Sequence, residues 1–158
     1  MIRKSKPNDL PSILAITERT GVFSKQEVAT VTELFQGFLT SPRKSGYNFL
    51  SYIRKNDLLG YVCWGPTPLS YGTVDLYWIC ADPSQQGKGV AARLFKAVEK
   101  AALKRGKWMI VIWTSSKPEY KRARRFYEKM GCTLEAQIKD FYDRGDDLCI
   151  YIRRLVNP

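Results

Sequence analysis

The sequence predicts a mixed α/β fold, in which helices lie on both faces of one sheet. Strand-like runs rich in β-branched and aromatic residues alternate along the chain with segments whose apolar residues recur at helical spacing. Clusters of Gly, Pro, Asn and Asp separate these runs. The chain has 158 residues and a hydrophobic content of 44%, which suffices for one compact domain over residues 1–158.

The N-terminal third predicts one strand and two helices. Residues 2–6 are a short strand-like run, and Asn8 is a favourable N-cap for a short helix behind it. Ser24 and Glu27 have the spacing of a capping box ahead of an apolar helical face. We therefore expect a second helix from this point, which ends before Pro42.

The remaining elements follow from the same patterns. Turn residues 55–57 and 143–147 each separate two strand-like runs, which is typical of hairpins. The expected elements are strands over 47–54, 58–64 and 73–81, a helix over 89–106, a strand over 109–113, a helix over 120–130, and strands over 132–142 and 148–155. The order β-α-α-β-β-β-α-β-α-β-β implies a mixed sheet with helices on both faces.

The composition excludes several kinds of chemistry. Because the chain contains no histidine, Ser-His and Cys-His mechanisms and the common zinc sites are excluded, and we expect no metal. The acid or base must then be Asp, Glu, Tyr, Lys or Cys. The cysteines stand far apart without CxxC spacing, which favours reduced, buried thiols: Cys63, Cys80, Cys132 and Cys149.

Charge and hydropathy bear on location and partners. The N-terminus lacks the apolar region of a signal peptide, and no apolar run approaches the roughly 18 residues of a membrane span, so we expect a cytoplasmic protein without a membrane partner. The net charge of +11 favours a polyanionic partner, either a phosphate-rich cofactor, nucleic acid or an anionic membrane. Charge alone does not choose among them, and a merely solvated basic surface is the alternative.

Residues 82–91 form the most informative segment. They join the strand over 73–81 to a helix, with Gly87 and Gly89 at the turn. Glycines let the backbone approach a ligand closely, and the free amides and partial positive charge of a helix N-terminus attract phosphate. Lys88 adds a full charge. The segment is neither a P-loop nor a Gly-x-Gly-x-x-Gly fingerprint, and an ordinary tight turn is the alternative reading.

Two motifs resemble the GNAT acetyltransferase superfamily. Gln86-x-x-Gly89-x-Ala91 is similar to its Gln/Arg-x-x-Gly-x-Gly/Ala signature, and residues 123–131, with Phe126-Tyr127-Glu128, resemble its second landmark at the expected distance. The likeness in element order extends over nearly the whole chain. The resemblance implies a single GNAT domain with a mixed, mostly antiparallel sheet flanked by helices. In this fold the strand that ends at Ala81 and the strand that begins at Met109 would splay apart to hold coenzyme A.

The resemblance also implies which residues bind acetyl-coenzyme A as cosubstrate. The pyrophosphate would lie on the amides of the loop, formed by Gln86, Gly87, Lys88, Gly89, Val90 and Ala91. The pantetheine arm would pair with the backbone near Ile79 and Ala81. Tyr120 stands where relatives often carry an Asn that contacts the cofactor, so this one hydrogen bond departs from the family pattern.

Acetyl transfer to an amine requires a proton acceptor and a proton donor. Tyr127 lies where many relatives place the tyrosine that protonates the coenzyme A sulfur, and core packing is the alternative role. Relatives often carry an acid early in the strand before the loop, and Asp75 corresponds to it; a solvated Asp, or proton removal through water, is the alternative. Strand alternation would place Asp75, Tyr77 and Ile79 on one face.

The acceptor itself is not specified by the sequence. We expect a primary amine of a small molecule attacked directly in a ternary complex, with a protein or peptide amine as the alternative. A basic nucleic-acid-binding module is the rival from another class, supported by the basic residues of 117–125, although we expect no specific nucleic acid. A homodimer is compatible with the sequence.

Aromatic residues near the expected site could line an amine pocket or belong to the core: Tyr71, Tyr77, Trp78, Trp113 and Tyr142. Asp146 and Asp147 could attract a cationic substrate or face water.

Overall fold

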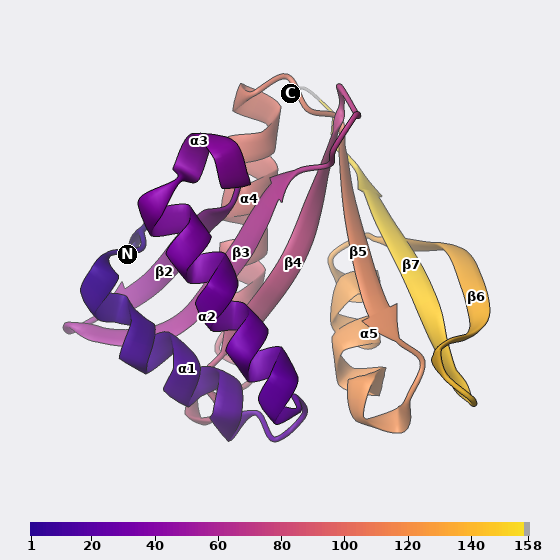
Figure 1. Ribbon diagram of the computed structural model, residues 1–158, viewed down its shortest axis with the longest axis horizontal. Helices are drawn as coiled ribbons and strands as arrows, with labels where there is room; N and C mark the ends of the chain where they lie inside the picture. Colours follow the sequence, from indigo (N-terminus) through magenta and orange to yellow (C-terminus); the bar gives the residue numbers. More distant parts are fainter. Residues whose placement is uncertain (157–158) are drawn as a thin grey trace. The chain divides into compact units, whose positions relative to one another are not determined.

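The computed structural model describes residues 1–156, and their contacts divide the chain into two compact units. The N-terminal unit comprises Met1–Pro66 and Tyr77–Val98, and the C-terminal unit comprises Thr67–Leu76 and the chain from Glu99 onward. The predicted order of strands and helices is confirmed (Figure 1). No helix among the described residues is both long enough and apolar enough to cross a membrane.

The bounds of the elements agree with the expected ones to within a few residues. Along the chain they are β1 (Ile2–Lys4), η1 (Pro7–Asp9), α1 (Leu10–Arg19), α2 (Lys25–Thr40), α3 (Pro42–Ser45), β2 (Asn48–Arg54), β3 (Asp57–Pro66), β4 (Thr73–Ala81), η2 (Pro83–Gln85), α4 (Val90–Lys104), β5 (Met109–Ser115), η3 (Pro118–Tyr120), α5 (Lys121–Lys129), β6 (Thr133–Asp143) and β7 (Asp146–Arg154), where η denotes a 3-10 helix. The short helix α3 and the three 3-10 turns were not predicted.

The strands form a mixed, mostly antiparallel sheet, as predicted. They are hydrogen-bonded in the order β1-β2-β3-β4-β5-β7-β6. The pairing of β4 with β5 is parallel and joins Thr73–Asp75 to Met109–Val111, three residues in each strand. The pairs β1 with β2, β2 with β3, β5 with β7, and β6 with β7 are antiparallel.

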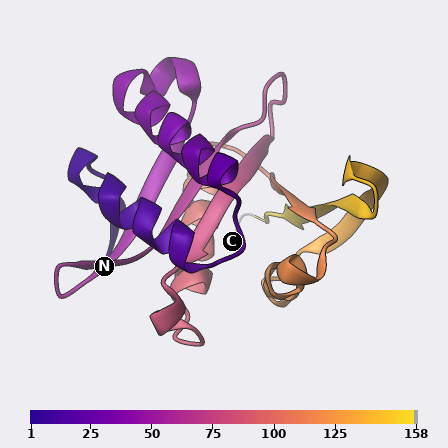
Figure 2. The same cartoon turned by 60° about the horizontal axis from the view of Figure 1, so that its bottom comes forward.

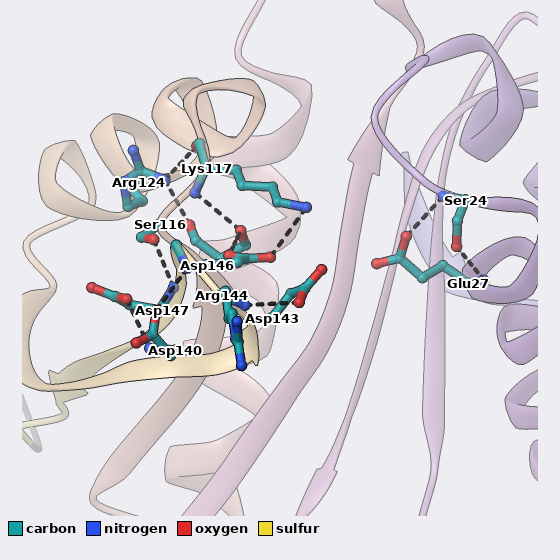
Figure 3. Close-up of polar contacts among 12 residues, drawn as sticks. Ser24, Glu27, Ser116, Lys117, Arg124, Asp140, Asp143, Arg144, Asp146 and Asp147 are labelled. Atoms are coloured by element: carbon teal, nitrogen blue, oxygen red, sulfur yellow. Dashed lines mark hydrogen bonds and ion pairs between the residues drawn. The ribbon is translucent and has the colours of Figure 1, made fainter.

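In the N-terminal unit, helices cover both faces of the sheet (Figures 1 and 2). The capping box predicted for α2 is confirmed, because the Glu27 amide donates to Ser24 Oγ and the Ser24 amide to the Glu27 carboxylate (Figure 3). On the α1 and α2 side the core consists of Ile13, Ile16, Val31, Phe35, Phe38, Phe49, Tyr61, Cys63 and Cys80. On the other side α4 lies so close to β3 that a Cβ on Gly60 would be 2.7 Å from Val90 Cγ1.

In the C-terminal unit, helices pack on one face of the strands. Tyr127 of α5 lies against Tyr151 of β7, with 6.0 Å between ring centroids, and Arg153 of β7 pairs with Glu99 of α4 at 2.7 Å. Because neighbouring strand residues point to opposite faces, Trp113 and its partner Ile150 lie on the other side. We call this second side, which carries Val111, Trp113 and Ile150, the open face of the unit.

Candidate functional site

The predicted phosphate loop begins at Asp82, which follows β4 directly. The Asp82 carboxylate accepts a hydrogen bond from the Ser84 amide at 2.9 Å and pairs with Arg19 of α1. Burial by itself would raise the pKa of Asp82, but the hydrogen bonds from Ser84 and the charge of Arg19 outweigh it and hold the pKa below its usual value. Asp82 therefore remains ionised at neutral pH and fixes the start of the loop to α1.

The two glycines of the loop adopt the left-handed conformation that glycine accommodates best. Gly87 has φ of +75° and Gly89 of +74°, and a Cβ on either would meet no atom within 4 Å. Both residues are exposed. The amides of Gln85, Gln86 and Lys88 donate within the loop. The amides of Gly87 and Gly89 donate to no acceptor among residues 1–156.

Helix α4 begins directly behind these glycines. The Arg93 amide donates to the Gly89 carbonyl at 3.0 Å, which completes the first turn and leaves the amides of Val90 and Ala91 without intrahelical acceptors. Val90 itself is buried against β3, so it fixes the helix to the sheet while its backbone faces the loop. Four amides and a helix N-terminus thus form an electropositive turn suited to a phosphate.

Basic side chains surround this turn. Lys88 Nζ donates to the Ser84 carbonyl at 3.2 Å and stays exposed. Arg93, one turn into α4, donates to the Tyr52 hydroxyl at 2.7 Å. Arg54 donates to Gln85 Oε1 at 2.8 Å. Sequence patterns gave no indication of this contact, because it joins the end of β2 to η2. These three side chains bring positive charge to the loop, while Asp82 and Asp57, which lies beside Arg54 and Gln85, are negative.

The strand before the loop departs from regular alternation. Trp78 and Cys80 belong to the α1 and α2 side, where Trp78 lies 5.7 Å from Phe23 between ring centroids. Tyr77 also reaches that side, since its ring lies 5.5 Å from that of Tyr47, which packs against the same cluster. The expectation that strict alternation places Asp75, Tyr77 and Ile79 on one face is therefore wrong, because the neighbours Tyr77 and Trp78 reach the same side. Ile79 and Ala81 are partly buried and precede the loop as predicted.

The two predicted catalytic residues belong to the C-terminal unit and lie on opposite sides of its strands. Asp75 is half-buried and aligned with Val111, which places it on the open face. Tyr127 is buried on the other side against Tyr151. Asp75 and Tyr127 therefore lie on opposite faces of the strands of this unit.

The surroundings of Tyr127 contain a second tyrosine. Tyr151 donates its hydroxyl to Glu128 at 3.1 Å, and burial together with this carboxylate raises the pKa of Tyr151 to about 12. Tyr151 therefore keeps its proton at any physiological pH. Tyr120, at the end of η3, is half-buried, and its amide donates to the Lys117 carbonyl at 3.1 Å.

A polar network fixes the turn between β5 and α5 (Figure 3). Arg124 Nη1 donates to the carbonyls of Ser115 at 2.6 Å and Lys117 at 2.9 Å. The buried Asp146 accepts from the Ser115 hydroxyl and lies 3.6 Å from Lys117 Nζ. Asp147 donates its amide to Ser116 Oγ at 2.8 Å. Asp146 and Asp147 thus fix the segment that precedes α5. The sequence analysis expected them only to attract a cationic substrate or to face water.

Four of the five aromatic residues named from the sequence are exposed rather than in the core. These are Tyr71, Tyr77, Trp113 and Tyr142, while Trp78 is partly buried. The cysteines are free and buried, as predicted. Burial raises the pKa of Cys63 and Cys149, and raises those of Cys80 and Cys132 to about 12. None is a ready nucleophile. Residues 1–156 contain no group of three or more Cys, Asp or Glu placed to hold a metal ion.

Comparisons with known proteins agree with this arrangement. The model of the acetyltransferase (GNAT) family matches residues 13–132. A solved structure of a proposed GNAT acetyltransferase from Desulfovibrio desulfuricans is 34% identical with a TM-score of 0.93, and 99% of each chain is covered. The chain therefore belongs to the GNAT family of acetyltransferases. No curated protein matches the sequence.

More distant structures share the fold. An aminoglycoside 6'-N-acetyltransferase complexed with coenzyme A is 13% identical with a TM-score of 0.78, covering 100% of this chain and 98% of that chain. The ribosomal-protein-S18-alanine N-acetyltransferase from Escherichia coli is 16% identical with a TM-score of 0.77, covering 100% of this chain and 95% of that chain. One of these enzymes is named for a small-molecule acceptor and the other for a protein, so the shared fold leaves the acceptor class undetermined.

Proposed function

We propose that the protein transfers an acetyl group from acetyl-coenzyme A to a primary amine of a small molecule by direct attack in a ternary complex. The observation that carries the proposal is the turn at Gly87 and Gly89, whose exposed amides lie at the start of α4. A cosubstrate with a pyrophosphate fits it because backbone amides and a helix N-terminus bind phosphate oxygens. In this proposal Gln86 to Ala91 hold the pyrophosphate, the backbone near Ile79 and Ala81 pairs with the pantetheine arm, and Tyr120 contacts the cofactor.

In the proposed acetyl transfer, Asp75 is the proton acceptor and Tyr127 is the proton donor. Asp75, directly or through water, takes a proton from the substrate ammonium, so that the neutral nitrogen can attack the thioester carbon. The C–N bond forms, the C–S bond breaks, and Tyr127 gives its proton to the departing thiolate. The second proton, which the nitrogen loses as it becomes an amide, passes through water and restores Tyr127. A phenol suits this step because its ordinary pKa near 10 keeps it protonated at neutral pH.

The proposal includes the cellular setting. Four buried, free thiols support a reducing compartment, which we infer to be the cytoplasm. The proposal also includes a homodimer, with which the sequence is compatible: the outer strand β6 is exposed over its whole length and paired on one side with β7, and such an edge is available to a second chain.

Replacing Gly89 by Asp tests the cofactor site, with Gly106 replaced by Asp as the matched control. Both glycines are exposed, have φ near +70° and leave open space for a Cβ, so backbone strain is similar in the two variants. A carboxylate at position 89 would repel the pyrophosphate, and calorimetry should show coenzyme A affinity at least about tenfold weaker, or about 1.4 kcal/mol. The Gly106 variant should bind as wild type. Unchanged affinity in a folded Gly89→Asp protein rules the placement out.

An amine panel tests the reaction itself. Release of free thiol from acetyl-coenzyme A is followed for each amine, and product masses establish that the acetyl group has moved to nitrogen. Acetylation confined to protein or peptide amines would contradict the small-molecule acceptor and leave the cosubstrate site intact.

A further inference from the structure

The open face of the C-terminal unit presents an aromatic pair to solvent. Trp113 on β5 is 56% exposed and Phe141 on β6 is 46% exposed. Their rings meet edge to face, with 5.8 Å between centroids and 89° between planes. Large aromatic side chains in mutual contact and half exposed form an apolar patch of the kind that marks a binding surface.

The part of the open face next to this aromatic pair is also apolar. Register aligns Trp113 with Ile150 of β7, and Ile150 with Ala136 of β6, so these side chains share the open face. Ile138, aligned with Leu148, lies on the same side and is 46% exposed. The apolar surface thus continues across three strands.

Asp75 lies at one end of this surface. It is aligned with Val111, and Trp113 follows Val111 by two residues on the same face. With strands about 4.8 Å apart and about 3.3 Å per residue, the Asp75 and Trp113 backbones lie roughly 8 Å from each other. A carboxylate and an aromatic ring at this separation match an ammonium joined to an apolar group by two or three atoms.

We propose that this face binds the acceptor, and that the acceptor is an amine with an aromatic or bulky apolar group a short linker away from its nitrogen. The inference rests on the proposed function and adds the acceptor class to it. The ammonium pairs with Asp75, where opposite charges attract, and the apolar group packs on Trp113 and Phe141. Trp113 and Phe141 are therefore specificity-determining residues, while the proton transfers remain those of Asp75 and Tyr127.

The test compares two amines, 2-phenylethylamine and ethylamine, with the intact protein. Wild type should acetylate 2-phenylethylamine with kcat/KM at least about tenfold higher than for ethylamine, since an apolar surface favours the larger apolar group. Trp113→Ala and Phe141→Ala should each lower that value about tenfold and change that of ethylamine less than about twofold. Leu134→Ala is the control, because Leu134 is a similarly exposed residue of β6 aligned with Tyr151 on the opposite face.

Calorimetry with 2-phenylethylamine gives a second readout that does not depend on turnover. Weaker binding in the Trp113→Ala and Phe141→Ala proteins, with coenzyme A affinity unchanged, supports the inference. Equal kcat/KM for the two amines in wild type and both variants overturns it and leaves amine acetylation standing. Binding of the amine without acetylation of any amine refutes the proposed reaction alone. A change from dimer to monomer in sedimentation, with amine preference unchanged, identifies the patch as a contact between copies and also overturns the inference.

Discussion

Replacing Gly60 by Ala should loosen the attachment of α4 to the sheet. The new Cβ would lie 2.7 Å from Val90 Cγ1, 2.8 Å from the Cys80 carbonyl oxygen and 3.2 Å from Leu94 Cδ1. Carbon atoms prefer about 3.5 to 4.0 Å, so α4 must move outward by several tenths of an ångström, and β4 must shift as well because the Cys80 carbonyl is part of that strand. Overpacking of this kind costs about 1 to 3 kcal/mol, and the stiffer unfolded chain offsets roughly 0.5 to 1 kcal/mol.

The net loss of about 1 to 2 kcal/mol should lower Tm by about 2 to 8 °C in thermal unfolding, at the 2 to 4 °C per kcal/mol typical of a chain this size. Because Val90 carries one of the loop amides, coenzyme A affinity should fall as well. Gly37→Ala is the control: its Cβ would lie 3.3 Å from the Tyr47 ring within a helix, where Ala is favoured, so Tm should hold or rise. A Gly60→Ala protein with wild-type Tm and affinity would refute the reasoning.

Three further predictions concern catalysis, pH and charge. Tyr127→Phe keeps the packing volume and should lower kcat about 10² to 10⁴-fold with coenzyme A affinity retained; wild-type kcat where chemistry limits the rate would make Tyr127 a core residue. Asp9 is buried, which raises its pKa, but hydrogen bonds from Arg3 and the Lys6 amide outweigh burial and lower the pKa below 3.8. This stabilisation is present above pH 3.8 and is lost as pH falls through the lowered pKa. The free energy of unfolding, measured with denaturant, should therefore fall over that range in wild type and fall less steeply in Asp9→Asn. Mixed DNA or RNA should bind weakly at physiological salt, whereas sub-micromolar binding at 0.2 M salt that depends on the exposed Arg122 and Arg125 would contradict this.

Local patterns were sufficient to predict most of the fold. The capping box at Ser24 and Glu27 fixed the start of α2, and the β-branched run 73–81 matched β4 at both ends. The helix expected over 120–130 begins instead with a 3-10 turn, and no side chain caps it. Arg124 donates from within α5 to the carbonyls of Ser115 and Lys117, which precede that turn, and spacing alone does not reveal this contact.

The candidate site was predictable where function depends on the backbone. The turn at Gly87 and Gly89 could be predicted because a positive φ strongly favours glycine at such positions. The contacts of Arg54, Arg93 and Asp146 were not, because each joins segments distant in sequence. Whether Asp75 and Tyr127 act in catalysis stays a prediction, as does the description of residues 1–158 as one domain.

The irregular point of β4 connects fold and proposed chemistry. Strict alternation would turn Tyr77 away from the α1 and α2 side that Trp78 and Cys80 occupy, yet Tyr77 and Trp78 both reach it. The chain passes from the C-terminal to the N-terminal unit between Leu76 and Tyr77, directly before this point. With the alternation broken at this point, Asp75 is aligned with Val111 of β5, and Ile79 and Ala81 still lie directly before the loop. If alternation continued unbroken through Tyr77, every later residue of β4 would lie on the opposite face, so the irregularity belongs to the fold and is not a defect of it.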